Sequence, residues 1–247
     1  MPSSPVKGAG FMLQGLRLIG RPGLKRFVLI PLMVNIVLFA GALWYGVAQF
    51  ERLMDRLQAS VPHWLDWLQW LLWPLFVLVL LIVVFYSFTL IANLIASPFN
   101  GLLAEKTEAL LTGRSLDDAG DYKKLIKELP VTLLEELRKL FYTLAWTLPF
   151  LILAFVLPLV GPLVWFLFTA WMLAVQYSDF PMGNHGLRFR AMRATLRRRR
   201  TLSLGFGAAA AGLTMVPVLN FVVMPAAVAG ATAMWVDELQ AVAVRTK

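Results

Sequence analysis

Hydrophobic residues are gathered into four long stretches that contain no ionisable side chain. The stretches have 24, 38, 39 and 36 residues and run over Phe27–Phe50, Trp67–Ala104, Leu140–Ser178 and Thr201–Val236. About 20 apolar residues are enough for a helix to cross the hydrocarbon core of a bilayer, which is about 30 Å thick. Each stretch therefore predicts at least one membrane-embedded helical segment.

The charged segments between the stretches indicate how often the chain crosses. Residues 1–26 and 179–200 are strongly basic, whereas residues 51–66 hold only two arginines. Cytoplasmic segments of membrane proteins carry an excess of Lys and Arg. If every stretch crossed once, the two basic segments would lie on opposite sides. The last two stretches are therefore predicted to be helical hairpins that enter and leave the membrane on one side.

Proline and glycine interrupt both hairpins and predict short arms. The uninterrupted runs are 8, 16, 9 and 11 residues long, over Phe150–Leu157, Leu163–Ser178, Ala208–Val216 and Ala226–Val236. At 1.5 Å per residue, the last of these arms is about 16 Å long, half of the hydrocarbon core. We expect hairpins that penetrate partway and are shielded by neighbouring subunits. Two full spans per hairpin are the alternative, because kinked helices also cross.

The second stretch is longer than one crossing needs. Residues 67–112 are predicted to form a long span with its membrane part at Val77–Leu94 and a cytoplasmic extension kinked near Pro98. Apolar residues at helical spacing predict an amphipathic helix over Leu125–Phe141. Residues 11–19 form either a short helix on the membrane surface or an ordinary leader to the first span.

The fold class that follows is an all-α integral membrane protein with two long transmembrane helices, two Pro/Gly-broken hairpins and a cytoplasmic helical segment. We expect one membrane domain over residues 1–247, with both termini in the cytoplasm. Its predicted parts are an N-terminal interfacial segment (1–26), span 1 (27–50), long span 2 (67–112), a cytoplasmic helical segment (113–139), hairpin 1 (140–178), an Arg-rich cytoplasmic loop (179–200), hairpin 2 (201–236) and a tail (237–247).

The composition supports a membrane protein and excludes several kinds of chemistry. Hydrophobic residues make up 59 % of the chain and charged residues 15 %, whereas a soluble domain has about 25 % charged residues. With no cysteine, the chain has no thiolate nucleophile, no disulfide and no Cys-ligated metal. It has no phosphate-binding GxxxxGK motif, and His63 and His185 are interpreted as surface or interfacial residues. We therefore expect no enzyme activity, no metal and no cofactor.

Residues 21–26, with the sequence Arg-Pro-Gly-Leu-Lys-Arg, form the clearest candidate site. Pro22 and Gly23 suit the start of a helix, where the first four backbone N–H groups lack partners within the helix. The helix dipole adds partial positive charge, and Lys25 and Arg26 add two full charges. The pattern predicts an oxyanion site. The competing interpretation is that these cations only anchor the segment in the cytoplasm.

Three polar residues of the second stretch, Asn93, Ser97 and Asn100, fall on one face of a helix. They either line a wet pathway or form hydrogen bonds between packed helices. No carboxylate lies within the four stretches, which favours passive conduction. The alternative is coupling through the flanking acids Glu105 and Glu108.

A run of four arginines, Arg197–Arg200, carries much of the excess positive charge. We expect it to hold its loop in the cytoplasm and to bind the headgroups of anionic membrane lipids. Attraction of an anionic solute is the other interpretation. Binding of nucleic acid is not expected, because no aromatic-rich reading surface accompanies the run.

Ordered motifs give the chain a resemblance to a known family. They are Gly23–Pro31 (GLKRFVLIP), Ile95–Lys106 (IASPFNGLLAEK), Gln176–Pro181 (QYSDFP) with Asn184-His185, and Met224-Pro225 followed by Gly230–Trp235 (GATAMW). With these motifs the chain resembles the bacterial CysZ sulfate permease family, which is grouped with EI24-like membrane proteins. The resemblance extends from about Phe11 to Trp235.

The resemblance implies a sulfate channel or permease of the bacterial inner membrane that supplies sulfur for cysteine synthesis. It also implies a homo-oligomer built from dimers, with two long transmembrane helices and partly penetrating hairpins. The family's sulfate-binding loop corresponds to Gly23, Leu24, Lys25 and Arg26. Lys25 stands where the family often has arginine, so the charge is kept but the bidentate fork is lost. The alternative is a membrane scaffold or accessory subunit that transports nothing and binds lipid or a soluble partner.

Overall fold

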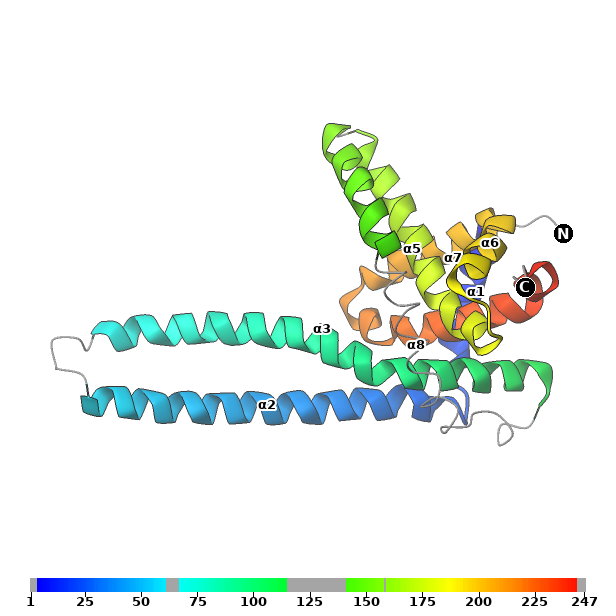
Figure 1. Ribbon diagram of the computed structural model, residues 1–247. Coiled ribbons are helices and arrows are strands. Elements are labelled where there is room, and N and C mark those ends of the chain that lie inside the picture. The colour runs from blue at the N-terminus through cyan, green and yellow to red at the C-terminus, as the bar shows by residue number, and fades with distance from the viewer. Residues whose placement is uncertain (1–3, 61–66, 115–140, 158, 244–247) are drawn as a thin grey trace. The chain divides into compact units, whose positions relative to one another are not determined.

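The computed structural model describes residues 4–60, 67–114, 141–157 and 159–243, and every regular element in these ranges is a helix (Figure 1). Three helical segments are long and apolar enough to cross a membrane, namely Lys25–Arg56, Gly161–Asn184 and Val222–Val242. The chain is therefore an all-α, multi-pass membrane protein, which confirms the predicted fold class. The cytoplasmic helical segment and the amphipathic helix over Leu125–Phe141 fall, apart from residues 113, 114 and 141, outside the described residues, as does His63.

The chain divides into two compact units, which are residues 29–97 and residues 1–28 together with 98–247. The first unit consists of most of α2 (Lys25–Ser60) and α3 (Trp67–Thr112), which are 36 and 46 residues long. At 1.5 Å per residue, these helices measure about 54 Å and about 69 Å. Each is therefore longer than a single crossing needs, and α3 continues as one helix past Pro98.

Within the unit of residues 29–97, aromatic side chains hold α2 and α3 together. The Phe50 ring stacks on the Phe76 ring with 3.7 Å between centroids and meets the Trp73 ring edge-on at 4.8 Å. Other large apolar side chains of this unit are exposed, with Trp44 at 75 % and Trp70 at 85 %. Exposed apolar surface of this extent is typical of helices that face lipid.

The remaining helices belong to the second unit, which contains the two helical hairpins. The helix Phe141–Val156 is followed by its partner α5, and α7 is followed by its partner α8 (Figure 1). The elements of this unit are α1 (Pro5–Leu18), the helix Phe141–Val156, α5 (Gly161–Asn184), α6 (Phe189–Arg198), α7 (Arg200–Thr214), α8 (Pro217–Met234), a π-helical turn η2 (Trp235–Leu239) and a 3-10 turn η3 (Gln240–Val242).

The hairpin arms are longer than the sequence analysis predicted. Helices α5, α7 and α8 have 24, 15 and 18 residues, so the predicted arms of 16, 9 and 11 residues are too short. Pro149 and Pro225 lie inside helices and do not end them, because a proline removes a single backbone hydrogen bond. Gly207 also lies inside a helix, where a Cβ atom would collide with the carbonyl oxygen of Ala170 on α5. This glycine allows two helices to pack closely rather than breaking one.

Helix α1 packs against both α7 and α8 and forms part of the core. Gly8 and Gly15 lie seven residues apart on one face of α1. A Cβ atom at Gly8 would collide with the carbonyl oxygen of Leu202, and one at Gly15 with the carbonyl oxygen of Ala226. Phe11, between them, is buried at 5 % exposure. This packing was missed by both interpretations of residues 11–19.

Ionic contacts tie α1 to the C-terminal segment. Lys7 Nζ forms an ion pair with the carboxylate of Glu238 in η2, and Arg199 NH2 lies 4.0 Å from the same carboxylate. The guanidinium of Arg198 donates a hydrogen bond to the carbonyl oxygen of Val242 at 3.1 Å. The Glu238 side chain is mostly buried, so solvent screens its ion pairs less than it would at an open surface.

Candidate functional site

The loop between α1 and α2 holds the four residues predicted to bind an oxyanion. Gly23 has φ +89°, in the left-handed region that glycine adopts without strain, and the turn through Pro22 and Gly23 leads directly into α2. Leu24 is fully buried and anchors the loop in the core. Lys25 and Arg26 are exposed. The loop therefore presents two cations to solvent from an anchored backbone.

Fewer backbone donors are free in this loop than an uncapped helix start would offer. The N–H groups of Leu24 and Lys25 both donate to the carbonyl oxygen of Arg21, at 3.2 and 3.4 Å. The N–H of Phe27 donates to the carbonyl oxygen of Leu24 at 3.0 Å. The turn before α2 therefore supplies partners for some of the N–H groups that lack partners within the helix. The positive charges of Lys25 and Arg26, rather than free backbone N–H groups, are therefore the main groups of this loop that attract an anion.

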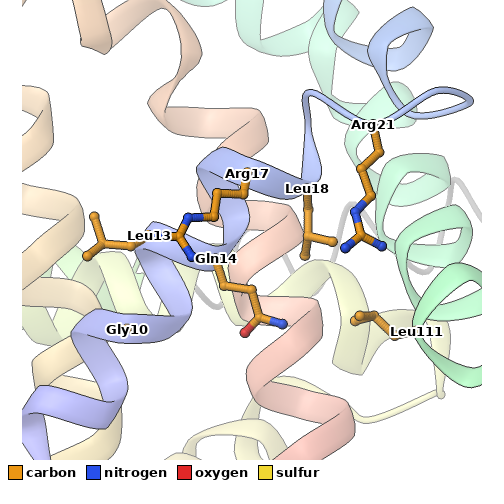
Figure 2. A pocket seen from close by; sticks show the side chains of 7 residues that line it. All are labelled: Gly10, Leu13, Gln14, Arg17, Leu18, Arg21 and Leu111. Carbon is orange, nitrogen blue, oxygen red and sulfur yellow. The ribbon is translucent and has the colours of Figure 1, made fainter.

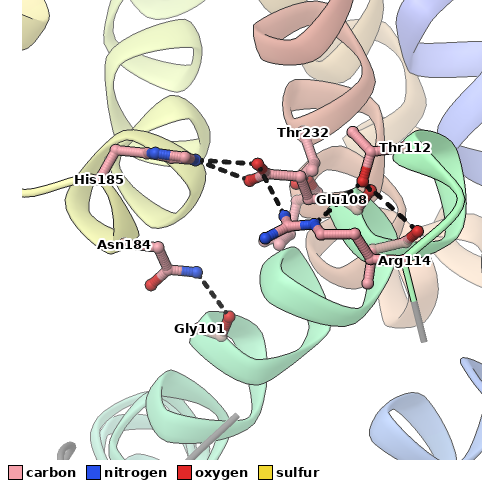
Figure 3. Close-up of polar contacts among 9 residues, drawn as sticks. Gly101, Glu108, Thr112, Arg114, Asn184, His185 and Thr232 are labelled. Carbon is pink, nitrogen blue, oxygen red and sulfur yellow. Dashed lines mark hydrogen bonds and ion pairs between the residues drawn. The ribbon is translucent and has the colours of Figure 1, made fainter. Parts of the chain in front are cut away.

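A second polar cluster lies where α3 and α5 end (Figure 3). The Glu108 side chain is 8 % exposed, and its carboxylate oxygens lie 2.8 and 3.0 Å from Nε2 of His185. The guanidinium of Arg114 donates to the same carboxylate at 3.1 Å. Asn184 Nδ2 donates to the carbonyl oxygen of Gly101 at 3.0 Å. The acid is thus paired with two basic groups, and the C-terminal ends of the two helices are joined.

The local sequence explains why these groups meet. Gly113 and Gly186, at φ +74° and +73°, follow the last residues of α3 and α5 and turn the chain at those points. The turn at Gly113 brings Arg114 back, and its N–H donates to the carbonyl oxygen of Ala109 at 2.9 Å. The turn at Gly186 leaves His185 at the helix end, where its ring can reach α3.

Several buried polar atoms around this cluster have no hydrogen-bond partner in the described part of the chain. They are Asn100 Nδ2 and Thr107 Oγ1 on α3, Ser178 Oγ on α5 and Trp235 Nε1 in η2. Asn100 and Thr107 are seven residues apart and therefore share a face of α3. Leaving a buried donor without a partner costs about 1–3 kcal/mol, so native proteins rarely do so without a reason. These four atoms, which we call the polar seam, retain unused hydrogen-bonding capacity.

Helix α6 forms a separate basic surface. Phe189, Met192 and Leu196 are buried on one side of it, while Arg190 and Arg197 are exposed on the other. Arg193 lies over the Tyr142 ring, 3.9 Å from its centroid, and burial lowers the pKa of the Arg193 guanidinium below its usual value. The apolar side of α6 is thus used inside the protein, and its outward side is cationic.

Residues 11–225 match the model of the protein family described as Sulfate transporter CysZ/Etoposide-induced protein 2.4. The chain belongs to this family. The matched range begins within α1, includes the Gly23–Arg26 loop and the Glu108 cluster, and extends into α8. The resemblance inferred from the sequence motifs is confirmed. Membership of the CysZ family supports a sulfate-transporter type of function and points to transport rather than catalysis.

The predicted pathway residues of this CysZ-family chain have different surroundings. Asn93 and Ser97 lie on α3, and their side chains fall outside what the structure describes. Asn100 is 3 % exposed and belongs to the polar seam, and Glu105 is half-buried. Glu108 lies in the ion-pair cluster. Among the described residues, no group of three or more His, Asp or Glu side chains is placed to hold a metal ion.

Sequence reasoning missed the partners of Glu108. His185, interpreted from the sequence as a surface or interfacial residue, is exposed, and its side chain also pairs with Glu108. The two residues are 77 positions apart, so helical spacing gives no sign of their contact. The motif QYSDFP with Asn184-His185 was the one sequence signal at this position, and it came from the family resemblance.

We predict that Glu108→Ala destabilises the folded protein by about 1–3 kcal/mol, because His185 and Arg114 lose the acceptor that they share. Thermal unfolding of the purified protein in detergent measures this. Glu105→Ala is the matched control, since Glu105 lies on the same helix, is more exposed and has no ion pair in the described part of the chain. Equal melting temperatures for the two variants would show that the cluster does not stabilise the fold.

Proposed function

We propose that this protein is a sulfate permease that imports sulfate across the bacterial inner membrane for assimilation into cysteine. The observation that carries this proposal is the α1–α2 loop, in which buried Leu24 fixes the backbone while Lys25 and Arg26 face solvent. A loop with two cations and a glycine at its turn suits capture of a small anion. The family match makes sulfate the natural choice of anion.

Electrostatics explains why capture needs such a loop. Sulfate carries two negative charges, and removing its water is costly unless other groups replace the lost interactions. Lys25 and Arg26 supply two compensating charges at the start of α2. The ion then passes along a polar route that includes Asn93, Ser97 and Asn100. Glu108 does not oppose this passage with a free charge, because His185 and Arg114 pair with it.

The exposed apolar side chains and the resemblance to the family support an oligomeric assembly. We infer a homo-oligomer built from dimers, in which neighbouring subunits cover hairpins that penetrate partway. Helix α5 and the segment Val222–Val242 are each long enough for full spans, so two crossings per hairpin remain the alternative arrangement. The basic segments favour a cytoplasmic location for both termini. The protein needs no cofactor or metal and performs no enzymatic reaction under this proposal.

Uptake of radiolabelled sulfate into liposomes that contain only this purified protein tests the proposal. Uptake without ATP or a pH gradient supports a channel. Uptake that requires an imposed pH gradient supports a coupled transporter. If neither condition gives uptake above empty liposomes, the protein does not transport sulfate by itself.

One observation favours a second function. The exposed arginines of α6, which are Arg190, Arg197 and Arg198, form with the nearby Arg200 a cationic surface that suits anionic lipid headgroups. A membrane scaffold or accessory subunit that binds lipid or a soluble partner could use this surface without conducting any ion. Absence of uptake in the liposome experiment, with the protein correctly folded, supports this alternative.

A further inference from the structure

A cleft of about 530 Å³ opens beside the α1–α2 loop and has no role in the function proposed so far (Figure 2). The last turns of α1, the start of the loop and the end of α3 enclose it. The residues that line it are Gly10, Leu13, Gln14, Arg17, Leu18, Arg21 and Leu111. One water occupies about 30 Å³ in the liquid, so the cleft has room for a small ion with several of its waters.

The polar side chains that line this cleft are either cationic or neutral. Arg17 and Arg21 contribute two guanidinium groups, Gln14 contributes an amide, and no Asp or Glu lines the cleft. Neither arginine has an ion pair in the part of the chain that the structure describes. Two uncompensated guanidinium groups in one concave site favour an anion with several oxygen atoms, because each guanidinium presents five N–H donors in a planar fork.

The backbone holds these donors in place. The opposite face of α1 is fixed by Gly8 and Gly15, which lie against the backbones of α7 and α8. The N–H of Ile19 donates to the carbonyl oxygen of Gly15 at 3.1 Å, and the N–H of Arg21 donates to that of Leu18 at 2.9 Å. These bonds occupy carbonyl groups at the end of α1 that would otherwise repel an anion.

The helix dipole explains only part of this arrangement. Arg17 lies in the last turn of α1, where a cation stabilises the helix end. Stabilisation of the helix end does not explain the positions of Arg21, which lies in the loop, and of Gln14, which lies about one turn before Arg17. Figure 2 shows Gln14 and Arg17 on α1 and Arg21 at the start of the loop, arranged around Leu18. Gly10, Gln14 and Arg17 follow one another at spacings of four and three residues and share a face of α1, whereas Arg21 lies beyond the end of that helix.

Arg21 also links the cleft to the Gly23–Arg26 loop. Its side chain lines the cleft, and its carbonyl oxygen accepts the N–H groups of Leu24 and Lys25. We propose that the cleft of Gln14, Arg17 and Arg21 is a binding site for a tetrahedral oxyanion, distinct from the Gly23–Arg26 loop and next to it in the chain. The assignment of sulfate as that oxyanion rests on the proposed function. The phosphate of an anionic lipid has the same chemistry and is the other source.

Sulfate binding to the full-length protein in detergent, measured by isothermal titration calorimetry at constant ionic strength, tests the site. The double variant Arg17→Gln/Arg21→Gln is expected to weaken sulfate binding about tenfold. The matched control is Arg52→Gln/Arg56→Gln, which removes two exposed arginines at the same four-residue spacing on α2. This control should bind sulfate as the wild type does.

Melting temperatures measured with two phospholipids distinguish sulfate from lipid phosphate as the oxyanion. Phosphatidylglycerol raises the melting temperature relative to phosphatidylcholine if a lipid phosphate occupies the cleft. Loss of that shift in the cleft variant alone, with sulfate binding unchanged, assigns the site to lipid phosphate. If the cleft variant matches the control in both arms, the proposal is overturned.

Failure of this proposal can be told apart from failure of the proposed function. If Arg26→Ala weakens sulfate binding and the cleft variant does not, the Gly23–Arg26 loop is a sulfate site and the cleft is not. The proposed permease function is then retained. If the cleft variant binds sulfate more weakly but the wild-type protein gives no uptake in liposomes, the cleft is an oxyanion site. The protein is then not a permease.

Discussion

Gly15→Ala is expected to prevent α1 from taking its place between α7 and α8. The new Cβ would collide with the carbonyl oxygen of Ala226 and lie 2.7 Å from the backbone nitrogen of Gly230. Overpacking costs about 1–3 kcal/mol when side chains can move aside, and here the colliding atoms belong to the backbone. We therefore expect a loss at or above the upper end of that range, together with a smaller yield of monodisperse protein. Thermal unfolding and size-exclusion chromatography in detergent measure both effects.

Gly10→Ala is the matched control for that variant. Gly10 lies on the same helix, and a Cβ atom there would meet nothing within 4 Å. Alanine is more favourable than glycine inside a helix by about 1 kcal/mol, so this control should be neutral or slightly stabilising. If both variants melt at the same temperature, α1 does not pack as the structure shows.

Arg26→Ala is expected to weaken sulfate binding by about 10- to 100-fold while the protein remains folded. Hydrogen bonds to charged groups contribute about 1.5–3 kcal/mol, and one cation of the loop is lost. The Arg26 side chain is exposed, and its one described contact is with the ring of the adjacent Phe27, so its removal leaves the core intact. Lys25→Arg should instead strengthen binding, because a guanidinium can bind two oxygen atoms of sulfate at once.

The control for Arg26→Ala is Arg56→Ala, which removes an exposed arginine from the other end of α2. Calorimetry at constant ionic strength compares the two, so that a change in net charge alone has the same effect in both. Unchanged sulfate affinity in Arg26→Ala would show that the Gly23–Arg26 loop is not the binding site.

The membrane architecture could be predicted from the sequence because it depends on the average hydrophobicity and the absence of charge over long stretches of the chain. Charge-free stretches such as Phe27–Phe50 identify embedded segments through the cost of burying charge in lipid, whatever the helices pack against. The hairpin arms could not be predicted in the same way. Proline and glycine are common at helix ends, so the sequence around Pro149, Pro225 and Gly207 predicts breaks. The structure shows that all three residues lie within continuous helices.

The candidate sites also differ in how far they could be predicted from local sequence. The Gly23–Arg26 loop is contiguous in sequence, so its glycine and cations could be found from local chemistry alone. The pair of Glu108 and His185 depends on contacts between α3 and α5, and no periodicity connects them. The role of α1 was hidden because Gly8 and Gly15 signal close packing only once the backbone of α7 and α8 is known.

Entry of radiolabelled sulfate into liposomes that contain only this protein is the most direct test of its function as a permease. We predict uptake above that of empty liposomes, competition by unlabelled sulfate but not by chloride, and a marked loss of uptake in Arg26→Ala. Equal sulfate entry into empty and protein-containing liposomes, with and without a pH gradient, would show that the protein does not transport sulfate by itself.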